Sequence, residues 1–97
     1  MEPAQRILIA DDEQDILALY KTKFEREGFT IFTATNGLDV VALAESIQPD
    51  LILMDVKMPK IDGITAQKKI YENEKTNTIP VIFLTAFSDP IASEIDD

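Results

Sequence analysis

Three aspartates and one threonine stand directly after short apolar runs, and these residues are Asp11, Asp12, Asp55 and Thr85. Carboxylates that are crowded together repel one another, and their pKa values rise unless a cation neutralises them. Hard oxygen ligands without histidine or cysteine favour Mg²⁺, with Mn²⁺ also possible. Magnesium held by one or two carboxylates completes its coordination with water and phosphate oxygens. These residues therefore predict a metal-assisted site for a phosphoryl group, provided that the fold brings them together.

The apolar runs are predicted to be strands of one sheet. Residues 7–10, 51–54 and 81–84 are continuously apolar, which is typical of strands that are covered on both faces. Residues 30–34 are weaker and partly alternating, which indicates a strand nearer an edge. Strands that alternate with helices predict an α/β fold with a parallel sheet and right-handed crossovers. Ligands bind beyond the carboxyl ends of such strands, where the aspartates would meet.

Four helical segments connect or follow the strands, and we expect them at residues 13–27, 38–47 and 64–74 and from Pro90 onward. Asp12 is a candidate N-cap of the first helix and Gly28 its candidate C′ residue. In the third helix we expect Ile64 and Ile70 to face the core. Asp89 is placed to cap the fourth helix, because proline is tolerated at a first helical position.

Composition excludes several classes of function. The chain has 97 residues, which is enough for one domain, and it has neither cysteine nor histidine. Thiolate zinc sites, disulfides and a histidine general base are therefore excluded. The net charge of −9, from 18 acidic and 9 basic residues, disfavours direct binding of nucleic acid. No apolar run approaches the roughly 20 residues of a membrane span, so we expect a cytoplasmic protein with no membrane partner.

Each candidate residue also has an ordinary structural interpretation. Asp12 taken alone is more often a helix cap, and Asp11 a solvated loop residue. Asp55 alone is compatible with a turn, and Thr85 alone with an ordinary strand end. Their joint occurrence at equivalent ends of predicted parallel strands is much harder to explain without a shared function.

The sequence resembles the receiver domains of bacterial two-component response regulators. The resemblance covers nearly the whole chain, and its motifs are residues 9–13 (IADDE), Asn36-Gly37, residues 49–55 (PDLILMD), Met58-Pro59, Asp62-Gly63 and residues 84–86 (LTA). It implies a flavodoxin-like, doubly wound parallel sheet with strand order 2-1-3-4. Residues 1–97 would then form a receiver domain that is C-terminally incomplete. The family's fifth strand, with its lysine and switch aromatic, and its fifth helix have no matching positions.

The resemblance also implies a role for each matching residue. Asp55 would be the phosphoacceptor that forms an aspartyl phosphate. Asp12, Asp55 and the backbone carbonyl of Lys57 would ligate Mg²⁺, and Asp11 would act through a bound water. Thr85 would offer its hydroxyl to the phosphoryl oxygens. The donor would be a histidine kinase or a phosphotransfer protein. The chain would not be an enzyme in the usual sense, although it would assist its own Mg²⁺-dependent phosphorylation and dephosphorylation.

Two other functions remain open on the sequence. A receiver-like scaffold that binds partners without being phosphorylated is one alternative, supported mainly by the missing C-terminal portion. A Mg²⁺-dependent phosphatase is the other, and it is weakened because Lys57 stands where haloacid-dehalogenase-type hydrolases carry a second aspartate.

The predicted fourth strand carries a further expectation. Without a fifth strand, residues 80–84 would form an exposed apolar edge of the kind that natural proteins protect. We expect either a polypeptide longer by roughly 20–30 residues, which we favour, or a homodimer formed through this edge.

Overall fold

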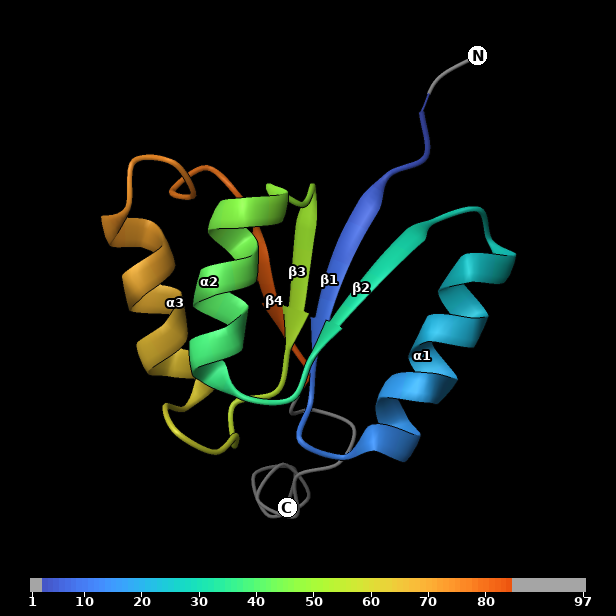
Figure 1. The fold of residues 1–97 in the computed structure, drawn as a ribbon, viewed down its shortest axis with the longest axis horizontal. Coiled ribbons are helices and arrows are strands. Elements are labelled where there is room, and N and C mark those ends of the chain that lie inside the picture. Colours follow the sequence, from blue (N-terminus) through green and yellow to red (C-terminus); the bar gives the residue numbers. More distant parts are fainter. Residues whose placement is uncertain (1–2, 85–97) are drawn as a thin grey trace, which may run out of the picture.

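The computed structural model describes residues 3–84 of the chain as alternating strands and helices. The elements are β1 (Arg6–Ala10), α1 (Gln14–Arg26), β2 (Thr30–Ala34), α2 (Gly37–Ile47), β3 (Leu51–Met54), α3 (Gly63–Glu72) and β4 (Val81–Phe83). The strands pair in parallel in the order β2-β1-β3-β4, which confirms the predicted topology (Figure 1). Thr85 and the helix expected from Pro90, with its cap Asp89, lie outside the described residues.

Two apolar layers hold the sheet between its helices. The layer beneath α2 and α3 contains Leu8 and Ile52, whereas the layer beneath α1 contains Ile9 and Leu53. Side chains of successive strand residues point to opposite faces, so both faces of β1 and β3 are buried. Figure 1 shows α2 and α3 side by side on one face of the sheet and α1 on the other. This arrangement explains why the two central strands are continuously apolar.

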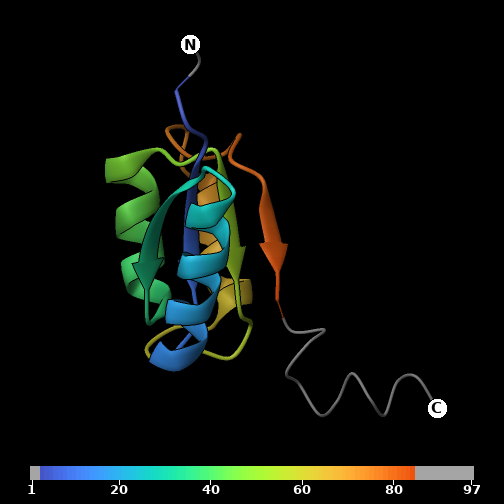
Figure 2. The ribbon, with the colours of Figure 1, turned by 90° about the vertical axis from the view of Figure 1, so that its right-hand side faces the viewer.

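The two outer strands differ from the central pair. β2 lies at one edge of the sheet, as predicted, and its residues Thr30 and Thr33 are exposed whereas Ile31 and Ala34 are buried. On β4, Ile82 is 52% exposed. It pairs with Leu53 and therefore lies on the α1 face, but α1 packs mainly on β1 and β2. Figure 2 shows β4 at the edge of the sheet away from β2. The prediction that residues 81–84 are covered on both faces is therefore wrong for β4 within residues 3–84.

The start of α1 also differs from the prediction. The helix begins at Gln14 with Glu13 at the N-cap, and the Glu13 side chain makes no capping hydrogen bond. The prediction that Asp12 is the N-cap is therefore wrong. The Asp11 carboxylate accepts a hydrogen bond from the Glu13 amide at 2.9 Å instead. At the other end, Gly28 has a φ of +98°, which confirms its predicted C′ role.

Side-chain caps fix the starts of α2 and α3, which both point toward the carboxyl ends of the strands. Asn36 accepts a hydrogen bond from the Asp39 amide, and Asp62 accepts one from the Thr65 amide. Each bond satisfies an amide that has no partner inside its helix, and a cap of this kind typically contributes about 1 kcal/mol. The two helix starts are thus held beside the loop that follows β3.

Of the two predictions about the inward face of α3, one is confirmed and the other is wrong. Ile70 is buried as predicted, but Ile64 is 46% exposed. In the first turn the inward positions are taken by Gly63 and Ala66, where only small side chains fit against the neighbouring backbone. The helix ends at Glu72 rather than at residue 74, and turns follow it. The helices of residues 3–84 are too short or too polar to traverse a lipid bilayer.

The connection from α3 to β4 is anchored by a buried hydroxyl. Thr76 is 1% exposed, and its hydroxyl donates to the Ile70 carbonyl at 2.7 Å. The Ile70 carbonyl also accepts a longer bond, of 3.4 Å, from the Asn73 amide. The Thr76 hydroxyl therefore makes the shorter of these two bonds to the Ile70 carbonyl.

Replacing Thr76 by valine keeps the shape of the side chain and removes this bond. We expect Thr76→Val to lower the free energy of unfolding by about 1 kcal/mol, the usual net value of one hydrogen bond. Thr78→Val is the matched control, because Thr78 is exposed in the same connection. Urea denaturation measures both variants, and an equal loss in the two would contradict the anchoring role of Thr76.

Candidate functional site

The backbone at the ends of β1 and β3 places two of the candidate carboxylates. The Asp55 amide donates to the Ala10 carbonyl at 2.9 Å, which continues the pairing of β1 with β3 one residue beyond the strands. The Asp11 amide donates to the Ala34 carbonyl of β2 at 3.2 Å. Both aspartates are therefore fixed by sheet hydrogen bonds immediately beyond the strand ends, where ligands of open α/β sheets bind.

The structure brings Asp11, Asp12 and Asp55 together. One carboxylate oxygen from each residue lies within 4.8 Å of the others, which is close enough to share one metal ion. The three side chains differ in exposure, because Asp11 is buried, Asp55 is half-buried and Asp12 is exposed. The cluster thus runs from the sheet core to solvent, which gives a ligand a route to the half-buried carboxylate.

Electrostatic repulsion acts on the most buried member of the cluster. Burial raises the pKa of the Asp11 carboxyl above its ordinary value, and the nearby Asp55 and Asp12 charges raise it further. The hydrogen bond from the Glu13 amide acts in the opposite direction and lowers that pKa. A divalent cation would relieve this repulsion, and the carboxylate oxygens present are the ligands that Mg²⁺ prefers.

The loop between β3 and α3 is tied down at both ends. The Lys57 amide donates to Asp55 Oδ1 at 3.4 Å, and the Gly63 amide donates to the Val56 carbonyl at 2.7 Å. In the middle of the loop, the Pro59 carbonyl accepts a hydrogen bond from the Gly37 amide of α2 at 3.4 Å. Asp55 therefore begins a loop whose backbone is supported by the first residues of both α2 and α3.

One further carboxyl in this region, that of the N-cap residue Asp62, has its pKa shifted by a hydrogen bond. The backbone amide of Thr65 lowers the pKa of the Asp62 carboxyl, because the bond favours the ionised form. Asp62 points to the start of α3 and is not a member of the three-carboxylate cluster. It stabilises the helix that supports the loop rather than the site directly.

Two further predicted site residues have different outcomes. Lys57 is exposed beside Asp55, and its backbone amide donates to the Asp55 carboxylate. Thr85 lies outside the described residues. The reasoning from sequence missed the supporting contact of Gly63 with the Asp55–Val56 backbone. The Asp62-Gly63 pair was a recognisable motif, but its packing depends on a fold-level contact.

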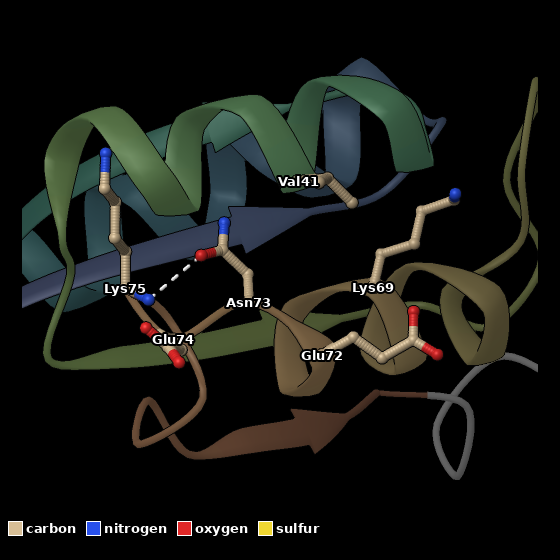
Figure 3. Close-up of a pocket in the computed structure, with 6 residues that line it drawn as sticks. All are labelled: Val41, Lys69, Glu72, Asn73, Glu74 and Lys75. Atoms are coloured by element: carbon tan, nitrogen blue, oxygen red, sulfur yellow. Dashed lines mark hydrogen bonds between the residues drawn. The ribbon is translucent and has the colours of Figure 1, made fainter.

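A separate hollow lies between α2 and the segment that ends α3 (Figure 3). Its lining residues are Val41, Lys69, Glu72, Asn73, Glu74 and Lys75. The Lys75 amide donates to Asn73 Oδ1 at 2.9 Å, and the Lys75 ammonium lies 3.5 Å from Glu45. The lining carries two lysines and two glutamates, and none of the three clustered aspartates belongs to it. The hollow is therefore distinct from the carboxylate site.

Known proteins are similar to this chain both in sequence and in fold. The regulatory protein AtoC of Escherichia coli K12 is 42% identical over 89 residues, which cover 92% of this chain and 19% of AtoC. The chain thus spans about a fifth of that relative's length. The N-terminal domain of a response regulator receiver protein from Methanoculleus marisnigri JR1 matches with a TM-score of 0.80 and 32% identity, over 94% of this chain and 76% of that one.

A third match bears on the metal. The receiver domain of the sensor histidine kinase PA1611 from Pseudomonas aeruginosa PAO1 has a TM-score of 0.83 and 28% identity, over 94% of this chain and 75% of that one. That domain has a magnesium ion coordinated in its active-site cleft. The family model described as "Response regulator receiver domain" matches residues 7–95 of the present chain. With the parallel 2-1-3-4 sheet and the aspartates at its carboxyl edge, this match shows that the chain belongs to the response regulator receiver domain family, whose members act in phosphorelay signalling.

Proposed function

We propose that Asp55 is the phosphoacceptor of this receiver domain and that Mg²⁺ assists the transfer. The observation that carries the proposal is the convergence of three carboxylates within 4.8 Å at the ends of β1 and β3. In this assignment Asp12, Asp55 and the Lys57 backbone carbonyl hold the metal directly, and Asp11 holds it through a water. When bound, Mg²⁺ would neutralise the negative charge that the carboxylates and the phosphoryl oxygens bring together.

The protein's own groups then position the nucleophile. A carboxylate oxygen of Asp55 attacks the phosphorus atom, an O–P bond forms, and the bond from phosphorus to the donor's leaving group breaks. The Lys57 amide donates to Asp55 Oδ1 and so fixes the rotation of the carboxylate. Thr85, which lies outside the described residues, would donate its hydroxyl to the phosphoryl oxygens after transfer.

The phosphoryl donor in this proposal is a histidine kinase or a phosphotransfer protein. Residues 1–97 contain no histidine, so a phosphohistidine donor lies outside them. A cytoplasmic location belongs to the same proposal, because kinases take their phosphoryl groups from ATP. The net charge of −9 supports the further proposal that this segment does not bind nucleic acid directly.

A second candidate function is assembly through β4. Within residues 3–84, β4 pairs only with β3, and Ile82 exposes 52% of its surface beside that edge. An exposed apolar edge strand is a template for pairing with another chain. We therefore include a homodimer formed through β4 as a candidate, and sedimentation of the protein over a range of concentrations would test it.

Metal binding tests the assignment of ligands. We expect Asp12→Ala to weaken Mg²⁺ binding more than Asp11→Ala, because the first removes a direct ligand and the second a water-mediated one. A loss of about tenfold or more is expected for Asp12→Ala, measured by calorimetry. Asp15→Ala is the control, since Asp15 is an exposed acid in the first turn of α1. Equal affinities of the wild type and Asp12→Ala would contradict the assignment.

Phosphorylation tests the nucleophile. Acetyl phosphate with Mg²⁺ should add one phosphoryl group to the wild type, and Asp55→Asn should abolish the addition, because an amide oxygen is a poor nucleophile. Intact-mass analysis measures both, with Asp15→Asn as the control that keeps the wild-type level. Thr85→Ala should retain phosphorylation and lose the conformational response. Labelling of Asp55→Asn at the wild-type level would place the nucleophile elsewhere.

The raised pKa of Asp11 predicts a pH dependence of stability in the absence of metal. Burial and the two neighbouring carboxylates raise the folded-state pKa above its ordinary value of 3.8, so the folded state binds the proton more tightly than the unfolded state. Protonation of Asp11 therefore stabilises the folded state fully below pH 3.8, and this stabilisation is lost as pH rises through the folded-state pKa. We expect Asp11→Asn to be more stable than the wild type at pH 7 in EDTA.

The stability difference should shrink as the solution is acidified, because the wild-type carboxyl then becomes neutral as well. Urea denaturation of both proteins across this pH range measures the effect. Asparagine keeps an oxygen that can accept the Glu13 amide bond, so the comparison isolates the charge. A variant less stable than the wild type at pH 7 would show that the charge of Asp11 does not destabilise the fold.

A further inference from the structure

The first residue of α3 lies directly against the backbone of the candidate nucleophile. A Cβ atom added to Gly63 would stand 2.4 Å from the Asp55 carbonyl oxygen and 3.0 Å from the Val56 Cα. Real Cβ atoms essentially never approach another heavy atom as closely as 2.4 Å. Gly63 is buried, and its amide donates to the Val56 carbonyl at 2.7 Å. The start of α3 is thus docked onto the Asp55–Val56 peptide.

The backbone of Asp55 is held at two points. Its amide is bound to the Ala10 carbonyl of β1, while its carbonyl packs on Gly63. The residue is therefore fixed by a strand through its amide and by a helix start through its carbonyl. The Lys57 amide, which contacts Asp55 Oδ1, comes only one residue after Val56. A shift of the peptide would move both the Asp55 carboxylate and the backbone of Lys57.

We propose that Gly63 is a positioning residue for the phosphoacceptor: its missing side chain lets α3 fix the direction of the Asp55 carboxylate and of the Lys57 carbonyl. The inference rests on the proposed function and assigns no contact of Gly63 with metal or phosphoryl group. Alanine at this position must displace the Asp55 backbone or the first turn of α3, since the clash is with main-chain atoms. A misplacement of about 1 Å can cost about 100-fold in rate.

A second glycine, Gly37 of α2, also lies close to the backbone of the loop after β3 and supplies the control. A Cβ atom on Gly37, at the start of α2, would stand 2.2 Å from the Ile61 carbonyl oxygen. The clash is as severe as that of Gly63, and it also involves the backbone of the loop after β3. It falls six residues beyond Asp55, however, and no atom of Asp55 or Val56 is among the three nearest atoms at Gly37. A comparison of Gly63→Ala with Gly37→Ala therefore distinguishes displacement of Asp55 from a general disruption of the loop.

The experiment compares the wild type with Gly63→Ala and Gly37→Ala at temperatures where each is fully folded by circular dichroism. Mg²⁺ affinity is measured by calorimetry, and the initial rate of labelling by acetyl phosphate is measured by intact mass. For Gly63→Ala we expect affinity to fall by about tenfold and the labelling rate by about 100-fold. For Gly37→Ala we expect affinity to stay within about threefold of the wild type, below the range of losses seen when supporting residues of metal sites are changed.

Several outcomes would overturn the inference, and they differ from a failure of the proposed function. Wild-type binding and labelling by Gly63→Ala, or equal losses in both variants, would show that Gly63 does not position Asp55. If the wild type itself neither binds Mg²⁺ nor becomes labelled, the proposed function fails instead, and the positioning role falls with it.

A measurement on the wild type covers the case in which Gly63→Ala does not fold. Because the Gly63 amide is bound to Val56, beside the proposed ligands, we expect Mg²⁺ to shift its NMR resonance strongly. The Gly37 amide, bound to Pro59 in the same loop, should shift much less. Shifts of equal size, or no shift of Gly63, would contradict a coupling between Gly63 and the site.

Discussion

The parallel pairing of β1 with β3 is the interaction on which the site depends. Ala10 of β1 pairs with Met54 of β3, so the two strands end at the same edge of the sheet. The residues that follow both strands therefore lie at that edge. The Asp55 amide then extends the pairing by one bond to Ala10. A register shifted by one residue would turn the side chains of β3 to the opposite faces of the sheet. Met54 is fully buried where it pairs with Ala10, so a shift that put Asp55 in its place would bury an unpaired carboxylate.

This pairing brings together charges that destabilise the folded state. Asp11 is buried next to two other carboxylates, and its pKa is raised as a result. Functional sites commonly hold ionisable groups in unfavourable surroundings that a ligand relieves. Here the surrounding structure is well packed, with Ile9, Ala10 and Met54 fully buried at the strand ends. The sheet core can therefore hold a carboxylate cluster in place before any cation binds, which makes the cluster a prepared site rather than one formed by the ligand.

The strand order came from the resemblance to receiver domains, whereas the sequence pattern itself predicted that the three aspartates meet. Continuous apolar runs located β1 and β3, and parallel strands then placed their following residues at one edge. The errors arose where local patterns compete with tertiary contacts. Asp12 has the right type for an N-cap, but Asp11 binds the Glu13 amide and the helix starts later. Ile64 fits an apolar helical pattern, yet the first turn of α3 packs through Gly63. The second outcome cannot be derived without knowing how α3 meets the loop after β3.

The central claim is that Asp55, and no other residue of the cluster, receives the phosphoryl group. The most direct measurement is the location of the modified residue after labelling by acetyl phosphate. Borohydride reduction converts an aspartyl phosphate into homoserine, and tandem mass spectrometry then locates the converted residue. Our account predicts homoserine at position 55 only, and only when Mg²⁺ is present during labelling. Conversion at Asp11 or Asp12, or equal conversion at Asp55 in EDTA, would contradict it.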